Sequence, residues 1–144
     1  MFNVFLDYPS HAEEIMVVKS TTSGTKVQLN KIMGGEEIMY FQDLVRRVPI
    51  TDNVLEYAVK LARKTRPESS EAPQVIKDFI SWGAGPRASQ YLAIGAKCNA
   101  ILNGKYAPDT EDVKAVALAI LRHRIVRNYK AEAEGMSVDT IIKK

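Results

Sequence analysis

The sequence predicts an all-α fold, a helical bundle preceded by a short extended segment. Apolar residues recur at three- and four-residue steps through most of the chain, and proline, glycine and capping residues divide these stretches into separate helices. The chain has 144 residues, of which 46% are hydrophobic and 26% charged. These values are typical of one globular domain with a single core, and they argue against a disordered chain.

The first residues depart from the helical pattern. Between Phe2 and Tyr8, alternate residues would lie on opposite sides, which indicates a strand, and Pro9 ends it. No second convincing strand follows, and a lone strand is not stable in water. We therefore expect residues 1–9 to be either a strand cut from a preceding sheet or an extended arm.

Helix signals mark the rest of the chain in order, with the bundle expected over residues 10–130. Ser10 and Glu13 form a capping-box pair that starts a helix ending near Lys19, and an irregular, mobile loop is expected from there to Gly35. The later helices are expected at 36–47, from Thr51 or Asp52 to Arg66-Pro67, from Pro73 through Ile80, at 87–102, from Asp109 into the basic run 122–127, and at 137–143. The last of these belongs to a C-terminal tail, residues 131–144.

The stretch from Trp82 to Ser89 organises the chain. Gly85 and Pro86 interrupt any helix that precedes them, and Arg87 begins a helical run that extends to about Leu102. Many residues of this run are alanine or glycine, so neighbouring helices can approach it closely. We expect it to be the central helix of the bundle.

Arg87 would lie in the first turn of that helix. The positive end of a helix dipole disfavours a cation there and favours an anion. An arginine beside free backbone N–H groups is suited to a phosphate or another anion that comes to the helix start. The alternative is that Arg87 points into solvent or pairs with a nearby carboxylate.

The basic run 122–127 allows two interpretations. On a continuous helix, Arg122 and Arg124 would project about 200° apart, and Arg124 would be half-buried with its head at a carboxylate or a subunit boundary. The simpler interpretation is that the cations stabilise a helix C-terminus. A net charge of only +3, with acidic residues among the cations, argues against nucleic-acid binding.

Other function classes lack the residues they require. Two histidines and one cysteine without close spacing do not indicate a metal site, and Cys98 lies on an apolar helix face where a buried thiol is common. No glycine-rich loop ends in Gly-Lys-Ser or Gly-Lys-Thr, so the chain is not a complete phosphate-cradling enzyme. No signal peptide or membrane-spanning run is visible, which makes a cytoplasmic location the default expectation.

Four motifs in order resemble the C-terminal part of MoxR-family AAA+ ATPases. They are Tyr8-Pro9-Ser10 followed by Glu13-Glu14-Ile15, residues 45–50, residues 82–88, and residues 121–125. Residues 131–137 are similar to that family's end segment, so the resemblance covers essentially the whole chain. Gly85 stands where the family more often has a small polar residue.

The resemblance implies that the chain is the lid subdomain of such an ATPase, a helical bundle above the nucleotide bound to a preceding α/β core. Arg87 is then similar to the second-sensor arginine, which reaches toward the γ-phosphate of ATP. Gly85 and Pro86 would set the angle of its helix, and Tyr8 and Pro9 would lie at the junction of core and lid. The Walker residues, the arginine finger and the magnesium that accompanies ATP would belong to the core. The chain alone is therefore expected to be inactive and not to bind ATP tightly.

The partners implied by the resemblance are the lid's own core, neighbouring subunits of a homo-oligomeric ring, and an unidentified client protein, with no membrane. The family is associated with chaperone-like maturation of protein complexes, including metal-cofactor insertion, and with methanol dehydrogenase regulation. The alternative is a free-standing helical interaction module without a nucleotide role. In that module, the apolar seam and the basic site at Arg122 and Arg124 would bind a partner protein.

Overall fold

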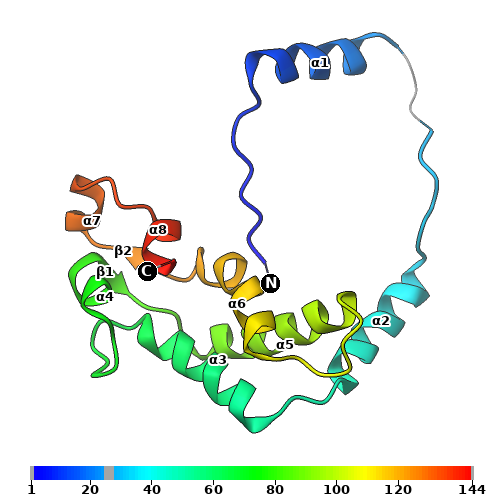
Figure 1. Cartoon of the computed structure of the whole chain (residues 1–144). Helices are drawn as coiled ribbons and strands as arrows, with labels where there is room; N and C mark the ends of the chain where they lie inside the picture. Colours follow the sequence, from blue (N-terminus) through cyan, green and yellow to red (C-terminus); the bar gives the residue numbers. More distant parts are fainter. Residues whose placement is uncertain (1, 25–27, 144) are drawn as a thin grey trace.

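The computed structural model describes residues 2–24 and 28–143, and it confirms the predicted all-α class. Figure 1 shows helices α3 to α8 gathered in a bundle, with α2 beside α5 and α1 standing apart at the far end of an extended segment. The helices are α1 His11–Thr22, α2 Gly35–Arg47, α3 Asp52–Lys64, α4 Gln74–Phe79, α5 Pro86–Leu102, α6 Thr110–Leu121, α7 Tyr129–Ala133 and α8 Val138–Ile142. Residues 25–27, part of the loop predicted before Gly35, lie outside the described residues.

Helix α5 lies at the centre of the core and packs against both α3 and α6. Its buried face consists of small residues and Leu92. At Gly95, a Cβ atom would lie 3.1 Å from side-chain carbons of both Val116 and Ile120 on α6. Because glycine leaves that space to its neighbours, the two helices approach closely. The prediction that this helix is central is confirmed.

The start of α1 is as predicted, but its end is not. The Ser10 hydroxyl accepts from the Glu13 amide at 3.4 Å, and the Glu13 carboxylate accepts from the Ser10 amide at 2.8 Å. The helix continues past the expected end near Lys19 as far as Thr22. Hydroxyl groups in its last turn donate to the carbonyls of residues 17 and 18, which lets serine and threonine remain helical.

Two short strands were missed by the sequence analysis. Strand β1 (Ile80–Trp82) pairs antiparallel with β2 (Val126–Arg127). The sequence analysis placed Ile80 in the short helix and continued the helix from Asp109 through 127, and both expectations are wrong. Helix α6 ends at Leu121, and the chain then turns so that Val126 can lie opposite Trp82. Strands this short depend on a tertiary contact and carry no periodic signal.

Residues 2–10, the N-terminal arm, are extended and form no assigned strand, which is compatible with both forms expected for this segment. The amide of Asn3 donates to the Ala119 carbonyl of α6 at 2.8 Å. The Phe2 ring lies over Gly95, where a Cβ atom would be 3.2 Å from Phe2 Cε1. In Figure 1 the arm leaves the bundle beside α6 and extends to α1. The arm is therefore attached to the bundle at its first residues.

The residues after 130, set apart in the sequence as a tail, pack on the bundle. Helix α7, which was not predicted, lies against α4, and α8 lies against α4 and α6. Ala131 and Ile141 are 0% and 1% exposed and belong to the main core cluster. Asn128 accepts from the Ala131 amide at 3.0 Å and donates to the Asp78 carbonyl at 2.8 Å, which fixes α7 beside α4.

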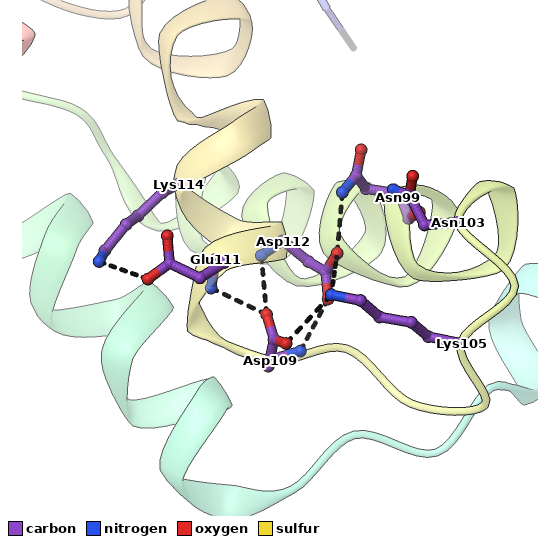
Figure 2. A network of polar contacts seen from close by, with 7 residues as sticks. All are labelled: Asn99, Asn103, Lys105, Asp109, Glu111, Asp112 and Lys114. Atoms are coloured by element: carbon purple, nitrogen blue, oxygen red, sulfur yellow. Dashed lines mark hydrogen bonds and ion pairs between the residues drawn. The ribbon is translucent and has the colours of Figure 1, made fainter.

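A buried carboxylate connects the end of α5 to the start of α6 (Figure 2). Asp112 is 1% exposed, and its Oδ1 accepts from Asn99 Nδ2 at 2.8 Å. Its Oδ2 accepts from the Asp109 amide at 2.9 Å, which completes a capping box at the start of α6, and lies 3.1 Å from Lys105 Nζ. Removal of one partner from such a network is costly, because it leaves a buried polar group or charge without its bonds. This network holds the α5–α6 connection in place.

We predict that Asp112→Asn lowers the free energy of unfolding by about 2–3 kcal/mol, because an amide puts an N–H group against donors and removes the charge. The matched control is Glu111→Gln. The Glu111 side chain is 70% exposed in its ion pair with Lys114, so its loss should cost below about 0.5 kcal/mol. Urea unfolding followed by circular dichroism measures both. Equal effects of the two variants would contradict the structural role of Asp112.

Candidate functional site

Arg87 lies in the first turn of α5, as the sequence predicts. Pro86 is the first residue of the helix and Gly85 is its N-cap, with φ −78° and ψ 179°. No side chain caps this end, and its first turn contains no acidic residue. The Arg87 side chain is exposed and forms no hydrogen bond or ion pair within residues 2–24 and 28–143. The guanidinium is therefore available to an anionic ligand.

Two residues at the end of α3 bind the turn before α5 through the backbone amide and the backbone carbonyl of Ala84. The buried hydroxyl of Thr65 accepts from the Ala84 amide at 2.8 Å and donates to the Ala62 carbonyl at 2.7 Å. Arg66 Nε donates to the Ala84 carbonyl at 2.9 Å. Ala84 itself is 0% exposed. The start of α5 is thus fixed to α3 by two hydrogen bonds that the sequence analysis did not foresee.

Glycine is sterically required at Gly83 and not at Gly85. A Cβ atom on Gly83 would lie 2.4 Å from the Thr65 carbonyl oxygen and 2.5 Å from Arg66 Cα. Around Gly85 there is open space within 4 Å, and its backbone conformation suits any residue. The sequence analysis expected Gly85 and Pro86 together to set the angle of α5, and that role stays a prediction. Nothing in the sequence pattern distinguishes the two glycines, because the difference arises from contact with α3.

Arg122 joins the end of α6 to α8 and to the N-terminal arm. Its Nε and Nη2 donate to the two carboxylate oxygens of Asp139 at 2.8 and 2.6 Å. The same guanidinium lies 5.7 Å from the centre of the Phe5 ring, and Nη1 is 3.4 Å from the Asn3 carbonyl oxygen. The bidentate bonds lower the pKa of Asp139 and raise the pKa of Arg122.

Arg124 is half-buried, as predicted, but not by helical periodicity, because α6 ends at Leu121. Its guanidinium lies 5.1 Å from the centre of the Tyr91 ring on α5 and donates to the Ile120 carbonyl. These contacts hold the turn after α6 against α5. The expectation that its head lies at a carboxylate or a subunit boundary stays a prediction.

The structure does not bring Tyr8 and Pro9 to Arg87. Tyr8 is 94% exposed, and its amide donates to the Asp7 side chain at 2.8 Å. Both residues lie on the arm directly before α1, away from the bundle in Figure 1. A role at a junction between core and lid thus remains a prediction.

An apolar groove between α2 and α5 was not foreseen. Its volume is about 550 Å³, and its walls include Phe41 and Val45 of α2 and Ile94 and Leu102 of α5. Cys98 lies in it, and burial raises the pKa of this thiol. Among the described residues, no three His, Cys, Asp or Glu side chains are arranged to hold a metal ion. No helix in that part of the chain has the length and apolar character to cross a membrane.

Residues 73–144 match the sequence family described as the AAA lid domain. The chain belongs to this family. The match begins immediately before α4 and includes the whole of α5 with Arg87. Residues of α3 that hold the turn lie outside it.

Similar proteins cover nearly all of the chain. It is 26% identical over 144 residues to the protein named Chaperone MoxR1 of Mycobacterium tuberculosis, spanning 100% of the chain and 38% of that protein. It is also 26% identical to the Bacillus subtilis protein YeaC, over 99% of the chain and 42% of that protein. A crystal structure of a candidate ATPase from Cytophaga hutchinsonii has a TM-score of 0.83 and 30% identity, over 99% of the chain and 44% of that structure. The predicted resemblance to the lid of MoxR-family AAA+ ATPases is confirmed. The chain spans less than half the length of these relatives.

We predict that Gly83→Ala destabilises the lid domain by about 1–3 kcal/mol, because the added methyl group collides with the backbone of α3. The matched variant Gly85→Ala enters open space, so its cost should stay below about 1 kcal/mol. Thermal unfolding of the two proteins, compared with the unchanged chain, tests the difference. If Gly85→Ala were the more harmful, the assigned contact between the turn and α3 would be wrong.

We predict that the contribution of Asp139 to stability is lost in acid. Its folded pKa lies below its unfolded value of about 3.9, so its stabilising effect is fully present above that pH and disappears as the pH falls through the folded pKa. The difference in unfolding free energy between the unchanged chain and Asp139→Asn should therefore stay constant from pH 7 to about pH 4 and shrink only below that pH. Urea unfolding at several pH values measures it. In an Arg122→Gln background the difference should be small at every pH.

Proposed function

We propose that this chain is the lid of a MoxR-type AAA+ ATPase, in which Arg87 contacts the γ-phosphate of ATP bound to an α/β core. The observation that carries this proposal is the combination at the start of α5. The Arg87 guanidinium is exposed and unpaired among the described residues, while the turn that precedes it is fixed to α3 at 2.8 and 2.9 Å. A guanidinium group that is free to bind, attached to a backbone that is fixed in place, is suited to recognition of a phosphate.

The contact with phosphate would be charge-assisted and would contribute about 1.5–3 kcal/mol. ATP in the core would draw the lid closed, because Arg87 gains this contact only when the two parts meet. Hydrolysis would remove the γ-phosphate and with it the contact, so the lid would relax. In this scheme the residues of this chain bind and orient the γ-phosphate of ATP. The reacting groups and the magnesium ligands would belong to the core.

The exposed apolar surface of the N-terminal third supports a large contact with another folded body. No residue in 2–24 or 28–53 is buried. Large apolar side chains exposed there include Phe2, Val4, Phe5, Leu6, Tyr8, Met16, Val17, Leu29, Ile32 and Met39. Surfaces of this kind in water indicate a missing partner. The proposed core would cover the arm, with Tyr8 and Pro9 at the junction, and α1.

The wider assembly follows from the relatives and belongs to the same proposal. MoxR1 is named a chaperone. We propose a homo-oligomeric ring in the cytoplasm, in which lid movement is transmitted to neighbouring subunits and used for remodelling or maturation of a client protein. We include methanol dehydrogenase among the kinds of client that the resemblance implies.

A second candidate function is a helical interaction module without a nucleotide role. The apolar groove between α2 and α5 favours it, because such a groove suits a partner helix. Arg122 and Arg124, which this hypothesis used as the basic partner site, both have partners inside the chain. The module hypothesis predicts that replacement of Arg87 is silent.

We predict that Arg87→Ala, in the polypeptide that joins this chain to its nucleotide-binding core, lowers ATP turnover by about 10- to 100-fold with no change in unfolding temperature. The side chain is exposed, so the fold does not depend on it. The control is Arg63→Ala. The Arg63 side chain on α3 is 53% exposed, and its ion pair with Glu71 is long, at 3.9 Å. Steady-state hydrolysis assays compare the variants. Unchanged turnover in Arg87→Ala would eliminate the lid-sensor function and favour the interaction module.

A further inference from the structure

We propose that Thr65 and Arg66 are positioning residues for Arg87, so that the C-terminal end of α3 determines where the Arg87 guanidinium lies. This inference rests on the proposed function, since it concerns how the same arginine reaches phosphate. Neither residue touches the nucleotide in the proposal. They act through the backbone of Ala84.

The two residues bind opposite polar groups of one buried residue. Thr65 Oγ1 accepts from the Ala84 amide at 2.8 Å, and Arg66 Nε donates to the Ala84 carbonyl at 2.9 Å. Either bond alone would hold one of the two peptide units beside Ala84 and leave the other free to rotate. Together they fix both peptide units relative to α3, because consecutive residues of one backbone supply the partners.

The Thr65 hydroxyl is itself fixed in direction. It donates to the Ala62 carbonyl at 2.7 Å, so its hydrogen is engaged and a lone pair faces the Ala84 amide. Thr65 is 6% exposed, which shields the bond from water. Gly83 closes the contact on the other side, where the backbone of residues 65 and 66 leaves no space for a Cβ atom.

The connection from this contact to Arg87 is short and rigid. Gly85 is extended, Pro86 has its φ fixed by its ring, and the Ala88 amide donates to the Gly85 carbonyl at 2.9 Å as α5 begins. A shift or rotation of the α3 end is therefore transmitted to the first turn of α5. Misplacement of a catalytic contact by about 1 Å can cost as much as 100-fold in rate, so this backbone attachment matters for the sensor.

Arg66 acts on Ala84 through the N–H group at its Nε, which donates a hydrogen bond, and not through its positive charge. Its side chain is half-buried, and Nε points to a backbone carbonyl of another element. Methionine at this position would keep an unbranched stem of similar length but has no donor where Arg66 has Nε. The neighbouring Arg63 differs, since it lies on the same helix end but has only a loose, exposed pairing with Glu71 at 3.9 Å.

The first test measures ATP hydrolysis by the core-containing protein with Arg66→Met, Arg87→Ala and the two combined. We expect Arg66→Met to lower kcat/KM for ATP about tenfold. In the Arg87→Ala background the same change should have almost no further effect, because a residue that acts through Arg87 has nothing left to position. The control Arg63→Met should stay within about twofold of the unchanged protein.

The second test uses the hydroxyl. Thr65→Val keeps the shape but removes the hydrogen bond to Ala84, whereas Thr65→Ser keeps the hydroxyl. We expect Thr65→Val to lower kcat/KM and Thr65→Ser to retain it, with faster hydrogen exchange in residues 83–87 for Thr65→Val alone. Hydrogen exchange follows the turn directly and is independent of turnover.

The outcomes separate this inference from the function on which it rests. If Arg66→Met lowers kcat/KM equally with and without Arg87, its role is general stability and the positioning inference is overturned. Full activity of Arg66→Met and Thr65→Val, when Arg87→Ala is impaired, overturns it as well. Full activity of Arg87→Ala overturns the proposed function and the inference together.

Discussion

The close approach of α5 to α6 depends on the lack of side-chain volume at Gly95, where carbons of Val116 and Ile120 already occupy the space that a Cβ atom would need. Because the buried side chains of α5 are mostly small, α3 can also pack beside this helix, and the buried core residues surround it. Both ends of α5 are then fastened by polar contacts. The Asp112 network holds its C-terminal end, and Ala84, just before its first turn, is bonded to α3. Arg87 therefore lies in the first turn of a helix that is held in place at both ends.

The three arginines singled out by the sequence have different environments. Arg122 is occupied by a bidentate pair with Asp139, and Arg124 lies against the Tyr91 ring and the end of α6. Arg87 has no such engagement within the described part of the chain. A cation that the fold leaves free is a better candidate for ligand binding than one that the fold uses for packing, since only the former keeps its donors for a ligand.

The N-terminal third is connected to the bundle much more loosely than the other elements are to one another. Its arm touches the bundle through Phe2 and Asn3, and Arg122 lies beside Phe5. The same Arg122 holds α8 through Asp139, so the arm and the C-terminal helix meet at one side chain. A displacement of the arm relative to the bundle would therefore act on α8 as well as on α6.

The sequence by itself determined the helical class, the order of the main helices, the capping box of Ser10 and Glu13 and the place of Arg87, because these depend on periodicity and on residues close in the chain. Four motifs in order, together with residues 131–137, were also enough to recognise the family. Only the tertiary structure decided that α6 stops at Leu121, that Ile80 and Val126 belong to strands, and that Gly83 is the constrained glycine. Each of these depends on a contact between segments far apart in sequence, such as Thr65 and Arg66 with Ala84. Local propensity contains no information about such a partner, so this part of the site became visible only when the chain was folded.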